Sequence, residues 1–246
     1  MRGSPSQRDP RGAAARARAR RDESQGGQLD LLSGARRGGP EPEPERWDLP
    51  DAELSLDRGF LPRDEADRLF AALRDEVAWR QDEVLVFGRR HAVPRLHQWY
   101  GEPGLVYRWS GIAMTPEPWT PAVAALRRRL EASVGVRFNS ALINLYRDGR
   151  DCVGWHADDE AELGPRPRIA SVSLGAGRDF VLRHRERRDL GTTKIHLTHG
   201  SLLVMGGATQ EAWVHALPRR LRVREARINL TFRTIMAERS PVTTVS

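Results

Sequence analysis

The chain has 246 residues, a formal net charge of +7 and one cysteine. That length suffices for a sizeable domain with a hydrophobic core, and no apolar run approaches the roughly 20 residues of a membrane helix. A single cysteine excludes a disulfide framework, and the polar start of the chain lacks the apolar segment of a secretory signal.

Arginine supplies nearly all of the positive charge, and Lys194 is the only lysine. This bias is typical of a G+C-rich genome. It also suits a polyanionic partner, because a guanidinium group can bind phosphate through two nitrogens. From charge and cysteine content we expect a cytoplasmic protein, bacterial and associated with the nucleoid.

Residues 1–46 have the composition of a disordered tail, with a basic block at 11–21 and a Pro-Glu run at the end. The short island QLDLL, at 28–32, resembles the peptides by which bacterial repair and replication proteins dock on the sliding clamp. An apolar peptide in a flexible tail suits docking in a groove. Alternatively, its leucines pack against the domain or have no partner. The expected clamp-binding residues are Gln28, Leu29, Leu31 and Leu32.

Two helices are predicted ahead of the strands. Residues 62–77 place apolar side chains along one stripe, with a proline and acidic residues in the first turn. A second helix is predicted from Pro121 to about Ser133, with Thr120 as its N-cap. The side chains expected to be buried are Ala66, Leu69, Phe70, Leu73, Val77, Val123, Leu126 and Leu130.

Past residue 136, short apolar or alternating runs are separated by Gly, Asp and Pro. Many short strands at close spacing favour a β-sandwich or barrel, and the two preceding helices are expected to pack on one of its faces. The runs are SALINLYR (140–147), RIASVSLG (168–175), RDFVLRH (178–184), TKIHLT (193–198), SLLVMG (201–206) and ARINLTFRTI (226–235).

The segment GWHAD, at 154–158, contains the first candidate metal ligands. If it is extended, His156 and Asp158 point to the same side and bring an imidazole and a carboxylate together. A second histidine would complete the two-histidine, one-carboxylate set of non-haem Fe(II) sites, which leaves positions open on the metal. Periodicity cannot choose among the candidates, which are His184, His196, His199 and His215.

The last predicted strand, ARINLTFR, has one apolar and one polar face. Its polar face carries Arg227 and Arg233, inside the sandwich or at its mouth. An unpaired buried charge is unfavourable, so we expect a carboxylate there, supplied either by the protein or by a ligand. Asn144 and Tyr146, two residues apart in INLYRDG, offer further hydrogen bonds to the same cavity.

Four motifs follow one another along the chain: INLYRDG, WHADDE, WVHALP and RINLTFR. This ordered set resembles the AlkB family of Fe(II)- and 2-oxoglutarate-dependent dioxygenases over about residues 80–236. VFGRRHAVPR, YRWSG, IASVSLG and RDFVLRH are particularly similar to the animal AlkB homologue 2 type. The resemblance implies an α+β, mainly β fold: a double-stranded β-helix (jelly roll) with supporting N-terminal helices. The implied parts are a domain at 47–239, a nucleotide-recognition region at about 80–120, a jelly-roll core at about 136–236 and a tail at 240–246.

The resemblance also implies a reaction that uses Fe(II), 2-oxoglutarate and O₂. Decarboxylation of 2-oxoglutarate would accompany hydroxylation of an N-methyl group on a base such as 1-methyladenine or 3-methylcytosine, followed by loss of formaldehyde. The implied iron ligands are His156, Asp158 and His215. The implied 2-oxoglutarate-binding residues are Asn144, Tyr146, Arg227 and Arg233.

A methylated base edge lies inside a duplex, so the nucleotide must be flipped out. By resemblance, the loop VLVFG (84–88) would push Phe87 into the gap as a wedge. Ordinary core packing, or an apolar strand ending in a turn, would explain the same aromatic residues. The implied base pocket contains Tyr107, Trp109, Ser110, Asp159 and Glu160. The expected DNA contacts are Phe87, Arg89, Arg90 and Arg95, with the cluster 183–188 as a second phosphate candidate.

The expected partner is alkylated DNA, with duplex favoured, and the protein is expected to act as a monomer without a membrane. Three alternatives stay open on the sequence. One is a related oxygenase that acts on RNA or protein. Another is a catalytically silent lesion-binding protein, which would be expected to have lost ligands. The third is a sugar-binding or redox-inert jelly roll with a structural metal, for which paired arginines have no obvious use.

Overall fold

The computed structural model describes residues 43–86, 88–105, 107–109 and 112–236. The predicted clamp peptide, Phe87 and Ser110 therefore lie outside the described residues, and Tyr107 and Trp109 are described by their backbone alone. Within the described ranges, no helix combines the length and apolar character that crossing a membrane requires.

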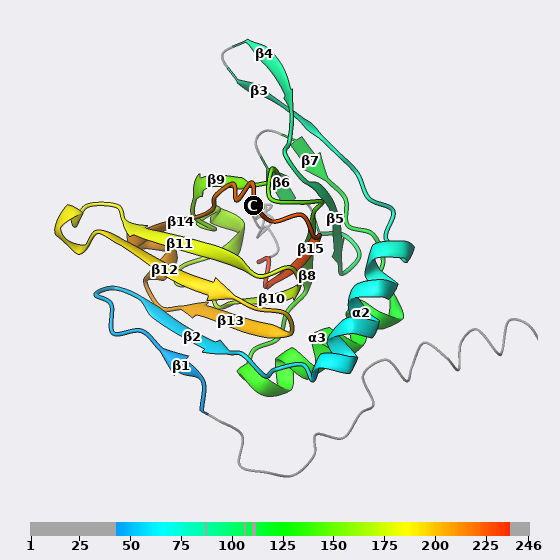
Figure 1. Cartoon of the computed structure of the whole chain (residues 1–246), viewed down its shortest axis with the longest axis horizontal. Coiled ribbons are helices and arrows are strands. Elements are labelled where there is room, and N and C mark those ends of the chain that lie inside the picture. Colours follow the sequence, from blue (N-terminus) through cyan, green and yellow to red (C-terminus); the bar gives the residue numbers. More distant parts are fainter. Residues whose placement is uncertain (1–42, 87, 106, 110–111, 237–246) are drawn as a thin grey trace, which may run out of the picture.

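Two antiparallel sheets packed against each other form the body of the protein (Figure 1). The larger sheet contains, in spatial order, β1 (Glu45–Arg46), β2 (Glu53–Asp57), β13 (Ser201–Gly206), β10 (Ile169–Gly175), β15 (Arg227–Arg233), β8 (Ser140–Tyr146) and β5 (Leu96–Gly101). The smaller sheet contains β12 (Thr192–Leu197), β11 (Arg178–His184), β14 (Trp213–Leu217) and β9 (Val153–His156). This arrangement confirms the predicted mainly β jelly roll.

Two hairpins stand outside these sheets. One pairs β3 (Glu83–Val86) with β4 (Arg89–Ala92) and projects away from the body (Figure 1). The other pairs β6 (Tyr107–Trp109) with β7 (Ile112–Met114). The short helical segments are η2 (Ala161–Leu163), η3 (Arg188–Leu190) and α4 (Thr209–Ala212).

Two longer helices, α2 (Arg63–Glu76) and α3 (Pro121–Val134), cover the outer face of the larger sheet, as predicted (Figure 1). The hydroxyl of Thr120 accepts the Val123 N–H at 3.3 Å, so the predicted N-cap is also confirmed. Gly135 ends α3 with φ 73°, a conformation that favours glycine. The strand pairing begins slightly earlier than expected, because β1 lies within the segment predicted as tail.

Alternation along β15 separates the core from the polar cavity. Ile228, Leu230 and Phe232 pack with the two helices, and the polar residues between them face the smaller sheet. In the paired strand β8, Asn144 lies opposite Asn229 and Tyr146 lies opposite Arg227. The sequence pattern therefore places these polar side chains inside the sandwich.

An ion pair between α2 and α3 supplies a test of this helical layer. Glu65 is buried and accepts a hydrogen bond from Arg129 Nη1 at 2.6 Å, and Arg129 also donates to the Phe60 carbonyl. We expect Glu65→Gln to lower the free energy of unfolding by about 2 kcal/mol, because it leaves a half-buried guanidinium without its carboxylate. Urea unfolding measures the change, with the exposed neighbour Asp64→Asn as control. Equal stability of the two variants would contradict the prediction.

Candidate active site

Three side chains predicted as metal ligands come together between β9 and β14. His156 ends β9 and lies directly opposite His215 of β14. One potential ligand atom each from His156, Asp158 and His215 lies within 4.8 Å of the other two. The local reason differs from the prediction, because β9 ends at His156 and Asp158 lies in the loop that follows. Pairing of β9 with β14 therefore builds the cluster, and an extended GWHAD segment does not.

Hydrogen bonds and charges prepare these groups for a metal. The ring Nδ1 of His156 lies 2.9 Å from the Gly154 carbonyl oxygen, an arrangement that leaves Nε2 as the acceptor for a metal. Burial would raise the pKa of Asp158, but Arg233 and the two histidines hold it down at about 2. Burial, with the nearby His156, lowers the pKa of His215 to about 3. At neutral pH the carboxylate is therefore ionised and His215 is neutral, the forms that bind metal.

The other candidate histidines make contacts outside the metal cluster. His184 accepts N–H groups from the turn at Glu186 and Arg187. His196 is exposed and lies 2.9 Å from a carboxylate oxygen of Asp179. His199 accepts the Gly175 N–H at 2.8 Å and lies near an acid of α2. Hence the structure chooses His215, which residue patterns alone could not do.

A cavity of about 320 Å³ adjoins the cluster, and the polar face of β15 lines it. Arg227 is buried there, donates from Nη2 to Ser173 Oγ at 2.9 Å and lies 5.2 Å from the Tyr146 ring centroid. Burial lowers the pKa of Arg227 to about 10, which still leaves it charged at neutral pH. Within the described part of the chain, no carboxylate lies within ion-pair distance of Arg227, and its Nε has no hydrogen-bond partner. A buried cation of this kind fits an anionic ligand.

The second arginine of the pair is already matched by the protein. Arg233 donates from Nη2 to Asp158 Oδ1 at 2.7 Å. The two alternatives left open by the sequence are thus both realised, since Arg233 meets a protein acid and Arg227 does not. Because Asp158 is also in the metal cluster, Arg233 links the metal site to the cavity.

Comparison with known proteins agrees with this geometry. Residues 53–233 match the 2OG-Fe(II) oxygenase superfamily. DNA oxidative demethylase ALKBH2 of Mus musculus is 45% identical over 181 residues, 70% of this chain and 76% of that protein. The chain belongs to the AlkB family of this superfamily. Alpha-ketoglutarate-dependent dioxygenase alkB homolog 3 of Homo sapiens is 44% identical over 192 residues, 75% of this chain and 66% of that protein.

A solved structure, "The structure of OsALKBH1", shares the fold with a TM-score of 0.55 and 18% identity, covering 77% of this chain and 100% of that chain. Membership in the superfamily implies Fe(II), 2-oxoglutarate and O₂ as cofactor and cosubstrates. The residues present fit them. Two histidines and one carboxylate suit Fe(II), and the buried Arg227 suits a carboxylate.

Arg95 lies elsewhere in this AlkB-family oxygenase than the sequence suggested. Predicted as a phosphate contact, it is buried, lines the cavity and donates from Nε to Asn144 Oδ1 at 2.8 Å. A side chain directed into the cavity is not available to phosphates on the surface, so that prediction is wrong. Arg95 instead orients the amide of Asn144, one of the predicted cosubstrate contacts.

Of the remaining predicted residues of this AlkB-family oxygenase, Glu160 lines the cavity next to the metal cluster. Asp159 points away to an exposed ion pair with Arg185, contrary to a role inside the base pocket. Arg89 and Arg90 are exposed on β4 of the projecting hairpin, as a DNA contact requires. Leu85 on the same hairpin is 71% exposed.

Gln210 is a site residue of this AlkB-family oxygenase that the sequence did not indicate. It lies in α4, is 1% exposed, and its Oε1 accepts the Asp158 backbone N–H at 3.0 Å. No local pattern points to it, because the bond joins residues 52 positions apart. By fixing the loop after β9, Gln210 positions the carboxylate of the metal cluster.

We expect Gln210→Leu to weaken metal binding about tenfold, because partners that orient metal ligands have effects of this size. Titration of the metal-free protein with Co(II), followed by visible absorption, measures the affinity. Glu211→Leu, an exposed change one residue away, serves as control. Unchanged Co(II) affinity in the Gln210 variant would show that the loop holds Asp158 without this bond.

Proposed function

We propose that this protein is an Fe(II)- and 2-oxoglutarate-dependent oxidative demethylase that repairs N-alkylated bases, of the 1-methyladenine and 3-methylcytosine type, in DNA. One observation carries the proposal: the His-Asp-His cluster shares a cavity with a buried arginine that has no carboxylate partner among the described residues. The name DNA oxidative demethylase, given to relatives 45% and 44% identical, supports DNA as the substrate.

The residues of the cavity have different proposed roles in the reaction. His156, Asp158 and His215 would hold iron, and Arg227 would bind a carboxylate of 2-oxoglutarate beside Tyr146. When bound, iron and 2-oxoglutarate supply the O₂-dependent oxidation of the N-methyl carbon, whose hydroxylated form releases formaldehyde. Asp158 and His215 are buried, whereas His156 is exposed, so the cluster has one side open for a substrate.

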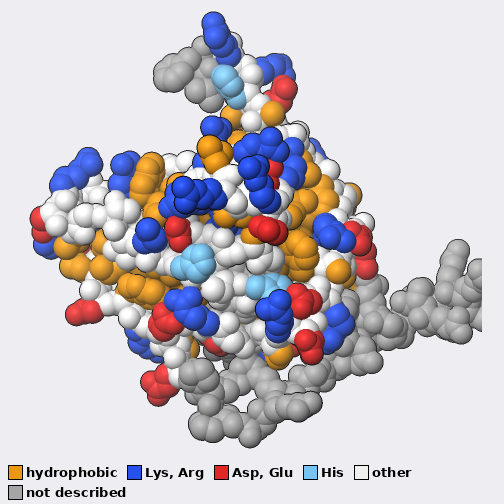
Figure 2. All heavy atoms as spheres, in the orientation of Figure 1, with side chains coloured by type: hydrophobic (Ala, Val, Ile, Leu, Met, Phe, Trp, Pro, Cys, Tyr) orange, Lys and Arg blue, Asp and Glu red, His pale blue; other side chains and the backbone are white. Residues whose placement is uncertain are grey.

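Access to DNA is assigned to the projecting hairpin and the face around it. Figure 2 shows basic side chains spread from the hairpin over the body beneath it. Exposed Arg89 and Arg90 would contact phosphates, and the exposed apolar Leu85 supports insertion of the hairpin tip into a duplex. We keep Phe87 as the proposed wedge and Tyr107, Trp109, Ser110 and Glu160 as the proposed base pocket.

One assay tests the proposed substrate. The protein is incubated with Fe(II), 2-oxoglutarate and oligonucleotides, DNA or RNA, each bearing one defined methylated base, and formaldehyde and repaired base are quantified. We expect demethylation of DNA, with faster reaction on duplexes. Demethylation of RNA alone, or 2-oxoglutarate turnover without loss of any methyl group, would reject the proposal. The complete ligand cluster argues against a catalytically silent lesion-binding protein.

The tail supports a separate proposal that rests on sequence alone. We propose that QLDLL, at 28–32, docks on the sliding clamp. Deletion of these five residues should weaken retention on an immobilised clamp while demethylation of free oligonucleotides stays unchanged. A variant with the same five residues in scrambled order controls for tail length. Equal retention of the intact and scrambled tails would refute docking.

We further propose a monomer in the cytoplasm, associated with the nucleoid. The basic composition supports this association, because it favours binding to a polyanion. Light scattering coupled to gel filtration tests the first part, and fractionation of the source cells tests the second. A dimer mass, or recovery away from the chromosomal fraction, would overturn the corresponding part.

A further inference from the structure

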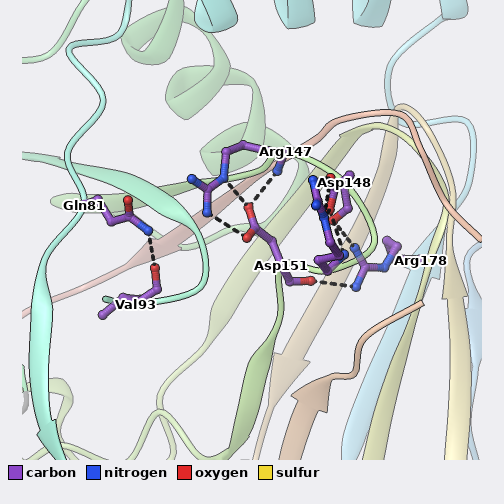
Figure 3. A network of polar contacts seen from close by, with 7 residues as sticks. Gln81, Val93, Arg147, Asp148, Asp151 and Arg178 are labelled. Carbon is purple, nitrogen blue, oxygen red and sulfur yellow. Dashed lines mark hydrogen bonds and ion pairs between the residues drawn. The ribbon is translucent and has the colours of Figure 1, made fainter. Parts of the chain in front are cut away.

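A second arginine without an acid partner lies behind the cosubstrate cavity. Arg178, the first residue of β11, is 1% exposed. Its guanidinium donates to backbone carbonyl oxygens of Asp148 (3.3 Å), Asp151 (3.0 Å) and Pro218 (2.8 Å). The carboxylate of Asp151 is close but is occupied by Arg147, as Figure 3 shows. Among the described residues, no carboxylate forms an ion pair with Arg178.

The three carbonyls belong to two loops that leave the active site. Asp148 and Asp151 follow β8, which carries Asn144 and Tyr146. Pro218 follows β14, which carries the metal-cluster histidine. Arg178 therefore connects the two loops that follow the strands carrying the proposed cosubstrate-binding and metal-binding residues.

Backbone hydrogen bonds between the same loops show how closely they approach. Gly149 donates to the Val223 carbonyl at 2.9 Å and accepts the Arg220 N–H at 2.7 Å. A Cβ at position 149 would overlap the Arg220 carbonyl, so glycine is required there. Since the backbones already join the loops, Arg178 is not their only connection.

Tyr146 connects Arg178 to the cavity. The Arg178 guanidinium carbon lies 5.9 Å from the Tyr146 ring centroid, and that of Arg227 lies 5.2 Å from it. Both guanidiniums are buried, and Arg178 is absent from the cavity wall. Two cations thus lie near one aromatic ring, and neither is neutralised by a described carboxylate.

We propose that Arg178 is a positioning residue for the dicarboxylate cosubstrate: it holds Tyr146 in place and adds positive charge behind Arg227. The inference rests on the proposed 2-oxoglutarate-binding role of Arg227. Backbone carbonyls need only a hydrogen-bond donor, which a neutral side chain also supplies. A full buried charge without an acid is unfavourable by itself, and an anion bound nearby offsets that cost.

The test compares two keto acids that differ only at the distal end. 2-Oxoglutarate carries the distal carboxylate, and 2-oxovalerate has the same chain length without it. Calorimetry measures the Kd of each acid for the full-length protein with Mn(II) in the metal site, in the wild type, Arg178→Gln and Arg178→Lys. Arg150→Gln is the matched control, because it also removes one arginine charge, at an exposed position of the loop whose carbonyls Arg178 contacts.

We expect Arg178→Gln to raise the Kd of 2-oxoglutarate about tenfold, with a change below about twofold for 2-oxovalerate. Arg178→Lys keeps the charge and should lie between wild type and Arg178→Gln, while the control stays within about twofold of wild type. Equal weakening of both acids, or no change for either, in folded Arg178→Gln would overturn the inference.

If Arg178→Gln does not fold, the same comparison is decided with Arg178→Lys, where selective weakening of 2-oxoglutarate supports the inference and equal effects on both acids overturn it. The measurement contains no DNA, so a different methylated substrate would leave it intact. Absence of 2-oxoglutarate binding by the wild type would reject the proposed function together with this inference.

Discussion

Replacement of His215 by alanine is expected to reduce Fe(II) affinity by at least about 100-fold and to abolish 2-oxoglutarate turnover. The variant loses one of three ligands, and no histidine among the described residues besides His156 lies in the cluster to replace it. Its neutral, buried imidazole needs no proton release on metal binding, since its pKa is already lowered to about 3. Fe(II) binding under anaerobic conditions and succinate formation measure the two effects.

His196→Ala is the matched control for this variant. His196 was a ligand candidate of equal standing on sequence patterns, but it lies exposed on β12 beside Asp179. We expect the control to bind Fe(II) like the wild type. If His215→Ala retained full affinity, or His196→Ala lost it, the assignment of the second histidine would be wrong.

Local patterns were sufficient where the physical cause is local. The N-cap at Thr120 sets the start of α3, where the sequence predicts it. Strict alternation in ARINLTFR separates its two faces, because a strand repeats every two residues. These local features predict the helical layer and the polar inner face of β15.

Local patterns cannot identify site residues that come together only through contacts between segments distant in the sequence. The pairing of β14 with β9 selects His215, and a hydrogen bond to Gln210 in a distant helix positions Asp158, which the local spacing already indicates. The family resemblance implies His215 as an iron ligand, but it does not indicate a role for Gln210. Arg95 was misplaced because a basic residue after an exposed hairpin has the same local signature whether it points outward or into a cavity.

Replacement of Arg227 by methionine is expected to weaken cosubstrate binding without lowering the stability of the fold. The Kd for 2-oxoglutarate should rise by about 100-fold, since a charge-assisted contact to a carboxylate is lost. The free energy of unfolding of the metal-free protein should be unchanged or higher by about 1 kcal/mol, because the variant removes a desolvated cation that no described carboxylate neutralises. Calorimetry with Mn(II) present and urea unfolding of the metal-free protein measure the two quantities.

Arg222→Met, an exposed change five residues earlier, controls for loss of one positive charge near the end of the chain. It should leave both the Kd for 2-oxoglutarate and the stability close to wild type. A large loss of stability in Arg227→Met would mean that the arginine holds the fold through Ser173 and Tyr146. Loss of 2-oxoglutarate affinity without loss of stability would instead mean that the Arg227 charge faces a ligand. Removal of a side chain that only supports the sandwich would lower the free energy of unfolding.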